Sequence, residues 1–223
     1  MNSFVKIAFL ATAIASIHPV AAQERKLAVV IGVNAYRGNS DLPTLQHATA
    51  DAAALSTTLR DVGFTVYEMT HDVARQAGQE TMAPQLVYIR DQIQGILESP
   101  NLGAKDTVLI TLHGHGVQYD LVDANGNKTP KFYFCPADAT VTGLKTANDI
   151  TDRNRLLPLE ELYDELAKCP AATKLLIVDA CRNDPTSPSV FRESLASATL
   201  PKLPPPTGGT AAFFSCKANQ RAV

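Results

Sequence analysis

Two histidines, each followed by a glycine, come directly after an apolar stretch and could carry out acid–base chemistry. The segment Leu109–Gln118 reads LITLHGHGVQ, which places the imidazoles at His113 and His115. A histidine can bind a metal, or it can act as general base and acid near neutral pH. The pair is therefore a metal site, a catalytic site or a polar loop, and a second reactive residue must decide.

That second residue is Cys181, which follows another apolar stretch in the segment LLIVDACRND. A cysteine at a strand end is often an inert, small hydrophobic residue. A neighbouring imidazole can instead activate the thiol as a thiolate and later protonate a leaving amine. Gly114 and Gly116 are then expected to let the backbone turn sharply, with their amides approaching a substrate carbonyl as oxyanion donors.

The elements that must position these residues alternate between strand and helix. Apolar runs predict strands, and apolar residues at helical spacing predict helices. The predicted strands are Lys26–Val33, Phe64–Met69, Thr107–Leu112, Lys174–Asp179 and Thr210–Ser215, and the predicted helices are Leu45–Val62, Pro84–Leu97 and Leu159–Ala167. This alternation predicts an α/β fold with a mostly parallel central sheet and helices on both faces. Adjacent parallel strands lie about 4.8 Å apart, so side chains at their carboxyl ends can meet.

Length and composition fit one exported domain. The chain has 223 residues, a formal charge of −2 and no tryptophan, and it lacks a block of basic residues, which argues against nucleic acid as a partner. Residues 1–22 are interpreted as a signal peptide, with an uncleaved N-terminal anchor as the alternative. Residues 23–223 then form the domain, without a membrane segment after signal removal, in the bacterial periplasm or outside the cell.

The four cysteines do not fit a zinc site, because no C-x-x-C pattern occurs. If Cys181 is a nucleophile, Cys135, Cys169 and Cys216 remain, so at most one disulfide forms. Exported proteins commonly form disulfides. We nevertheless favour three buried thiols, because Cys135 and Cys216 stand at the ends of apolar runs.

Taken in order, the motifs resemble those of the caspase-like cysteine peptidases, nearest the bacterial relatives of metacaspases and paracaspases. The matching segments are Ile31–Asn34 with Asp51 downstream, His113–Gly116, Phe132–Asp138, Asp179–Cys181 and Thr210–Val223. The resemblance implies a caspase-like three-layer sandwich. It also implies a cysteine endopeptidase with His115 as general base and acid, Cys181 as nucleophile and Gly116 as oxyanion donor. His113 would line the substrate pocket, or it is simply a polar strand end.

The resemblance further implies a substrate class. Asp51 and Asp179 match acidic pocket positions of the family, and two carboxylates favour a guanidinium. We therefore expect cleavage after Arg, with Lys second, in protein or peptide substrates. Alternatively, Asp51 is a helix-surface carboxylate and Asp179 caps the following loop.

The Pro-, Ser- and Thr-rich segment Asp184–Gly209 is either an exposed connector or a site of self-processing. Basic residues in and beside it are the candidates for cleavage: Arg182, Arg192 and Lys202. The chain ends at Val223, where the resemblance implies further acidic and sheet residues, so a truncated domain is one expectation.

No cofactor is expected, although calcium activation stays open. An acidic and amide-rich cluster lacks the spacing of a helix–loop–helix calcium loop and is interpreted as a turn; it comprises Asp120, Asp123, Asn125 and Asn127. The rival interpretations are a catalytically silent caspase-like binding domain, a peptidase of the gingipain or legumain kind, and a metal site built from His113 and His115.

Overall fold

The computed structural model describes residues 24–37, 42–122, 125–141, 155–183 and 210–215. The predicted signal peptide, the segment Asp184–Gly209 and Cys216 lie outside the described residues.

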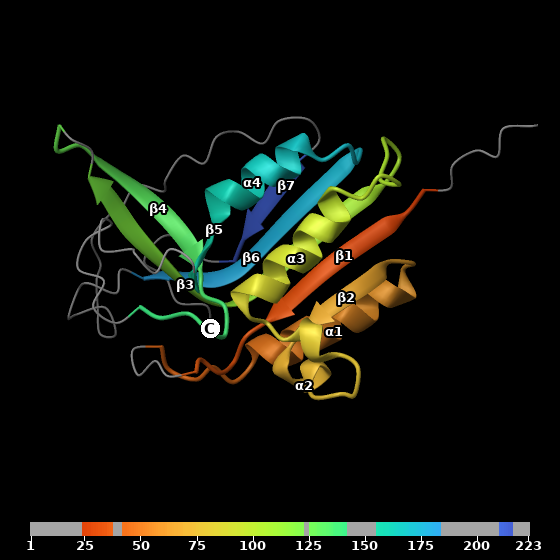
Figure 1. The fold of residues 1–223 in the computed structure, drawn as a ribbon, viewed down its shortest axis with the longest axis horizontal. Coiled ribbons are helices and arrows are strands. Elements are labelled where there is room, and N and C mark those ends of the chain that lie inside the picture. The colour runs from red at the N-terminus through yellow and green to blue at the C-terminus, as the bar shows by residue number, and fades with distance from the viewer. Residues whose placement is uncertain (1–23, 38–41, 123–124, 142–154, 184–209, 216–223) are drawn as a thin grey trace, which may run out of the picture.

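The centre of the fold is a seven-stranded, mostly parallel sheet (Figure 1). Its parallel part runs in the order β2, β1, β3, β6, β7. Strand β4 pairs antiparallel with the second half of β3, and β5 pairs antiparallel with β4. The strands are β1 (Lys26–Gly32), β2 (Thr65–Met69), β3 (Thr107–Val122), β4 (Lys128–Phe134), β5 (Leu157–Pro158), β6 (Thr173–Asn183) and β7 (Thr210–Phe214).

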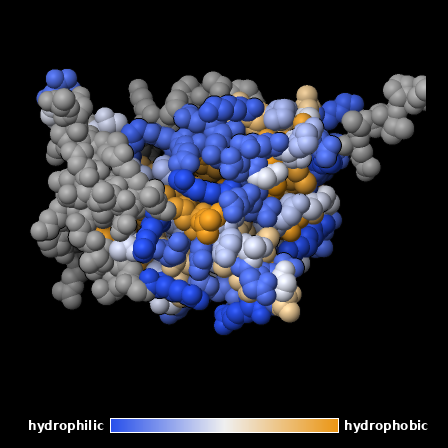
Figure 2. Space-filling view, viewed as in Figure 1, coloured by the Kyte–Doolittle hydropathy of each residue, from blue (hydrophilic) through white to orange (hydrophobic). Residues whose placement is uncertain are grey.

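Helices cover both faces of this sheet, which confirms the predicted α/β sandwich. They are α1 (Ala48–Asp61), α2 (His71–Ala74), α3 (Leu86–Leu97) and α4 (Leu159–Lys168), and a 3₁₀ turn occurs at Glu80–Met82. Helices α3 and α4 pack on one face and α1 on the other, because alternate strand residues join two separate apolar clusters. The outer surface over α3 and α4 is mostly hydrophilic, with a small hydrophobic patch near its centre (Figure 2).

The Ile31–Asn34 segment explains how α1 is placed. A Cβ atom at Gly32 would lie 2.7 Å from the Cβ of Ala52 and 2.8 Å from the carbonyl of Ala48, so only glycine permits this close approach. Asn34 then accepts a hydrogen bond from the backbone N–H of Thr49 at 3.0 Å, which satisfies one free donor at the helix start. These contacts set the first turn of α1, which carries Asp51, beside the end of β1.

The predicted end of the third strand at Leu112 is wrong, and so is the predicted sharp turn at Gly114 and Gly116. Strand β3 continues to Val122 because β6 pairs with it as far as Val117 and β4 takes over from Gly116 onward. The histidines therefore lie within a strand, and each is held by pairing on at least one side.

The Phe132–Asp138 segment forms the end of β4 and the turn after it. The carboxylate of Asp138 accepts a hydrogen bond from the backbone N–H of Leu86 at 2.9 Å, at the start of α3. The helix is thus capped by a residue distant in sequence, which ties the β4 turn to the layer above the sheet.

We predict that Asp106→Asn lowers the free energy of unfolding by about 1–2 kcal/mol. Asp106 accepts hydrogen bonds from the backbone N–H and guanidinium of Arg25 and from Gly103 N–H, which fixes the start of β1 against β3. Arg25, hydrogen-bonded to it, lowers the pKa of Asp106 from 3.8 to about 2. The stabilisation is therefore complete above pH 3.8 and is lost as the pH falls toward 2.

Urea unfolding at pH 7 and at acid pH measures this contribution. The gap between wild type and Asp106→Asn is expected to shrink at acid pH. Equal stability at pH 7 would contradict the assignment.

Candidate active site

The register of β3 and β6 brings the two predicted reactive positions together. His113 is paired with Asp179, and His115 is paired with Cys181, across adjacent parallel strands. The two motifs therefore lie on neighbouring strands as expected, although both are inside the strands and do not follow their ends. The pairing follows from an uninterrupted ladder that begins at Thr107 and Thr173, far from the histidines.

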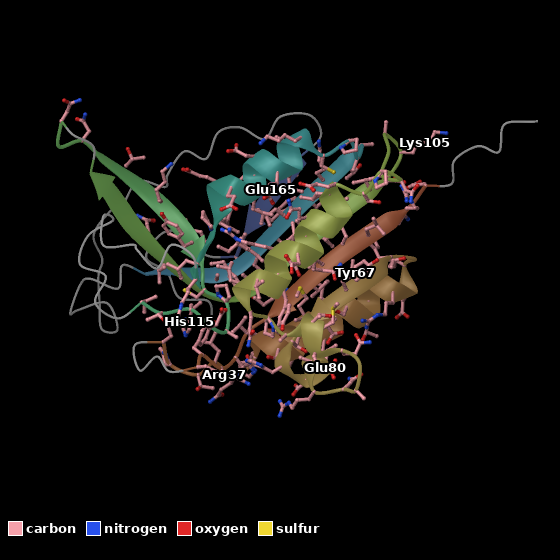
Figure 3. The ribbon with its side chains drawn as sticks, in the orientation of Figure 1. Arg37, Tyr67, Glu80, Lys105, His115 and Glu165 are labelled. Carbon is pink, nitrogen blue, oxygen red and sulfur yellow. The ribbon has the colours of Figure 1, made fainter. Side chains whose placement is uncertain are left out.

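His115 is held by three contacts. Its Nε2 lies 2.8 Å from the carbonyl oxygen of Pro43, and its backbone N–H donates to the hydroxyl of Tyr36 at 2.8 Å. Its ring lies 5.1 Å from the ring of Tyr36, centre to centre. Figure 3 shows His115 near the end of the sheet at which β1 terminates. Because a carbonyl can only accept, Nε2 carries the proton and Nδ1 is the basic nitrogen of the neutral ring.

Burial lowers the pKa of His115 below its ordinary value, and the hydrogen bond to the Pro43 carbonyl partly opposes this effect. The imidazole is therefore mostly neutral at neutral pH. A neutral imidazole with a free Nδ1 can accept a proton from a thiol.

Tyr36 was not singled out from the sequence, yet it completes the β3 ladder. On the edge of β3 away from β6, pairing with β1 ends at His113 and pairing with β4 begins at Gly116. The N–H of His115 lies between these two pairings and faces neither strand. The Tyr36 hydroxyl takes that place and in turn donates to the carbonyl of Val33 at 3.3 Å. Only the nearness of Tyr36 to the Ile31–Asn34 motif could have hinted at this role.

Gly114 is required by the same arrangement. A Cβ atom at Gly114 would lie 2.9 Å from the Tyr36 hydroxyl and 3.2 Å from the ring of Phe134. The first glycine of the motif therefore makes room for Tyr36.

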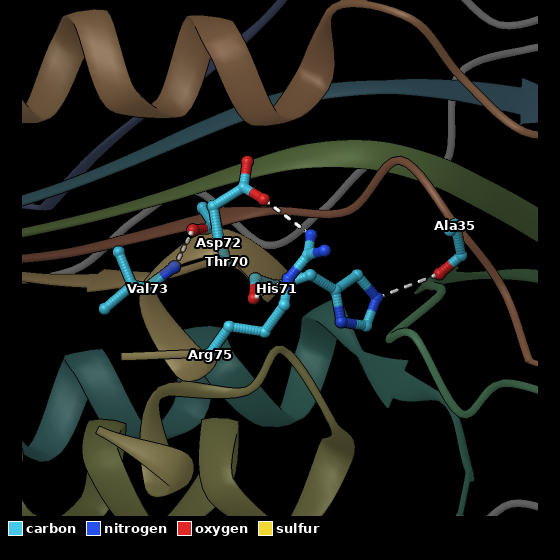
Figure 4. A network of polar contacts seen from close by, with 6 residues as sticks. All are labelled: Ala35, Thr70, His71, Asp72, Val73 and Arg75. Carbon is cyan, nitrogen blue, oxygen red and sulfur yellow. Dashed lines mark hydrogen bonds and ion pairs between the residues drawn. The ribbon is translucent and has the colours of Figure 1, made fainter. Parts of the chain in front are cut away.

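Helix α2 anchors the segment that carries Tyr36. His71 Nε2 lies 3.2 Å from the carbonyl oxygen of Ala35 (Figure 4). Thr70 caps the start of α2, because its side chain accepts a hydrogen bond from the backbone N–H of Val73. The side chain of Arg75 pairs with Asp72 across the same helix. These contacts fix the backbone immediately before the tyrosine.

The imidazole of His113 lies near the carboxylate of Asp179 and is also affected by the charge of Asp51. Its Nδ1 is 3.7 Å from Oδ2 of Asp179, while Oδ1 of Asp179 accepts a hydrogen bond from the hydroxyl of Ser215. Burial lowers the pKa of His113, and the charges of Asp179 and Asp51 act in the opposite direction. The two predicted acidic residues therefore both act on one imidazole, although Asp179 comes from β6 and Asp51 from α1.

The remaining predicted positions are placed as follows. Gly116 is paired with Arg182 of β6 on one side and with Phe134 of β4 on the other.

Cys135 and Cys169 are buried free thiols, and burial raises the pKa of Cys135. Their burial confirms two of the three thiols predicted to be buried.

A search of the described residues for metal ligands finds no group of three or more His, Cys, Asp or Glu side chains. Asp123, part of the acidic cluster discussed above, lies outside those residues. Among the helices in the described ranges, none has the length and apolar character needed to cross a membrane.

An α/β sandwich whose neighbouring strands pair a histidine with a cysteine defines a class of cysteine peptidase scaffold. The family model for the caspase domain matches residues 25–223, nearly the whole chain. The chain therefore belongs to the caspase-domain family.

The crystal structure of protein GSU0716 from Geobacter sulfurreducens is similar in fold, with a TM-score of 0.49 and 21% sequence identity. The match covers 70% of this chain and 50% of that one, so this chain matches only half of its relative. A search of curated proteins finds no significant match.

We predict that Gly114→Ala destabilises the protein by about 1–3 kcal/mol, because the new methyl group overlaps the Tyr36 hydroxyl. In the Tyr36→Phe background the overlap with oxygen is removed, so the same substitution should cost less. Thermal unfolding of the four proteins in this double-mutant cycle measures the coupling. Additive effects of the two substitutions would contradict the close contact.

Proposed function

We propose that the protein is a cysteine endopeptidase in which His115 and Cys181 form the catalytic dyad. The observation that carries this proposal is the register that pairs these two residues across adjacent parallel strands. The family membership of residues 25–223 supports peptidase activity in general.

In the proposed reaction, Nδ1 of His115 takes the proton of the Cys181 thiol, and the thiolate attacks the substrate carbonyl carbon. The tetrahedral intermediate collapses to an acyl-enzyme when the imidazolium returns its proton to the leaving amine. Water, deprotonated by His115, then hydrolyses the thioester and restores the thiol. The Pro43 carbonyl supports each step because it holds the imidazole by Nε2 and stabilises its positive charge.

We further propose that the N–H of Gly116 stabilises the oxyanion of the tetrahedral intermediate. The N–H of His115 donates to Tyr36 and its carbonyl accepts from Cys135, both on the edge away from β6. Successive backbone amides of a strand point to opposite edges, so the N–H of Gly116 faces β6, the strand of Cys181. Gly116 is paired with Arg182 there, so this N–H must leave the ladder with β6 to bind an oxyanion, and its assignment rests on the resemblance of His113–Gly116 to the family motif.

We infer that the side chain before the cleaved bond is cationic, with Arg preferred over Lys. Asp179 is one-third exposed, and Asp51 is an exposed residue of the first turn of α1. Both carboxylates act to raise the pKa of His113, which supports a common acidic region. A guanidinium can form paired, charge-assisted hydrogen bonds there.

We predict hydrolysis of short fluorogenic peptides that end in Arg, weaker hydrolysis of those ending in Lys, and none after Asp. Cys181→Ala should lower kcat/KM by at least about 10³-fold, because it removes the nucleophile. Asp179→Asn should lower kcat/KM for the Arg peptide by about 100-fold, through loss of the charge that holds the substrate.

These assays are run with and without calcium, and Asp106→Asn serves as a control at a carboxylate on the opposite end of β3. Cleavage after Asp would overturn the acidic pocket and keep the dyad. A lack of cleavage in every peptide would favour the catalytically silent binding domain.

We also propose that the enzyme cleaves its own Asp184–Gly209 segment or the adjoining Arg182, since basic residues occur there. The prediction is that purified wild-type protein separates into two fragments, whereas Cys181→Ala stays intact. Intact mass spectrometry of both proteins is the measurement. A single uncut species in both would exclude self-processing, and cleavage in both would point to a contaminating protease.

A further inference from the structure

The imidazole of His113 is buried without a hydrogen bond. Its side chain is 8% exposed, and neither ring nitrogen has a hydrogen-bond partner among the residues that the structure describes. Buried polar side chains are nearly always paired, so an unpaired imidazole next to a proposed dyad calls for an explanation. Nδ1 of His113 lies 3.7 Å from Oδ2 of Asp179, which is longer than a hydrogen bond.

The Asp179 carboxylate is placed between two partners. Oδ1 is occupied by the hydroxyl of Ser215, whereas Oδ2 faces the imidazole of His113. One-third of the Asp179 side chain is exposed, so a substrate can reach the same carboxylate that His113 faces from inside. Two cations, one from the protein and one from the substrate, could therefore pair with Oδ2.

Four groups set the charge around His113. Asp179 on β6 and Asp51 on α1 are the acidic groups that act on it, and His115 follows two residues later on β3. Ser215, after β7, contributes a neutral hydroxyl to Asp179. Burial lowers the pKa of His113 from 6.5, so the ring is neutral near pH 7 and gains its proton in acid.

We propose that His113 sets the affinity of the acidic pocket, because a protonated His113 pairs with Asp179 and displaces the cationic side chain of the substrate. When His113 is neutral, the carboxylate of Asp179 is available to pair with the cationic side chain of the substrate. This proposal rests on the proposed function, since it assumes that Asp179 binds a cation. It makes His113 a specificity-determining residue that acts through Asp179.

The expected effect follows from linkage. If the cation binds only when His113 is neutral, its dissociation constant rises by up to about tenfold for each pH unit below the His113 pKa. A neutral side chain of similar size at position 113 cannot take up a proton. The affinity of the pocket for the cation should then vary little between pH 5 and 7.

Binding is measured apart from catalysis in the Cys181→Ala protein, with acetyl-arginine amide as the probe and NMR titration as the readout. In this background, the dissociation constant is expected to rise as the pH falls through the pKa of His113, which burial holds below 6.5. Cys181→Ala with His113→Gln should show a flat profile. Cys181→Ala with Glu165→Gln is the control and should keep the rise, because Glu165 lies on α4 and is not among the charges that act on His113.

A second measurement keeps the test independent of probe affinity. The imidazole resonance of His113, identified by its loss in His113→Gln, should titrate at a lower pH in Asp179→Asn than in the parent. An unchanged titration overturns the pairing, and so does a pH profile of binding that is the same with and without His113.

The outcomes also separate this proposal from the proposed function. Cysteine-dependent cleavage after Arg, together with an unaltered pH profile in His113→Gln, refutes the role of His113 alone. An absence of Arg cleavage and of probe binding at every pH refutes the acidic pocket, and the role of His113 fails with it.

Discussion

The site depends above all on the continuous parallel ladder between β3 and β6, which runs from Thr107 to Val117 on one strand. Side chains alternate between the two faces of a strand, so a slip of one residue would send a reactive side chain to the wrong layer. Both faces of this ladder are buried under helices, which makes such a slip costly. The relative positions of His115 and Cys181 are thus set by the whole apolar sheet.

Along its other edge, β3 pairs first with β1 and then with β4, which leaves a position between them without a strand partner. Where neither strand is available, the Tyr36 hydroxyl accepts the N–H of His115 and its ring packs on the imidazole. Gly114 provides the space for that hydroxyl. A backbone gap that would leave a donor unpaired is in this way used to hold the residue proposed as general base.

Burial lowers the pKa of both histidines, but their hydrogen-bonding surroundings differ. In both, desolvation lowers the pKa, but His115 is held by a backbone carbonyl whereas His113 faces a carboxylate without a hydrogen bond. A carbonyl orients a ring and stays neutral, so it suits a proton-transfer group. A carboxylate is a charge that can be shared with a ligand, which is the basis of the proposed coupling between His113 and substrate binding.

The sequence by itself determined the element types, the two-faced sheet and the placing of the reactive motifs on neighbouring strands, because these follow from local periodicity and motif order. It did not determine the extension of β3 through both histidines or the existence of β4, since β3 is extended by pairing with the distant strand β6 and β4 forms by folding back on that extension. The contacts of Tyr36, Asp138 and Ser215 likewise join residues more than thirty positions apart in the chain. A single hydroxyl or carboxylate leaves no periodic signal, so only the tertiary structure could assign these side chains to the site and its supports.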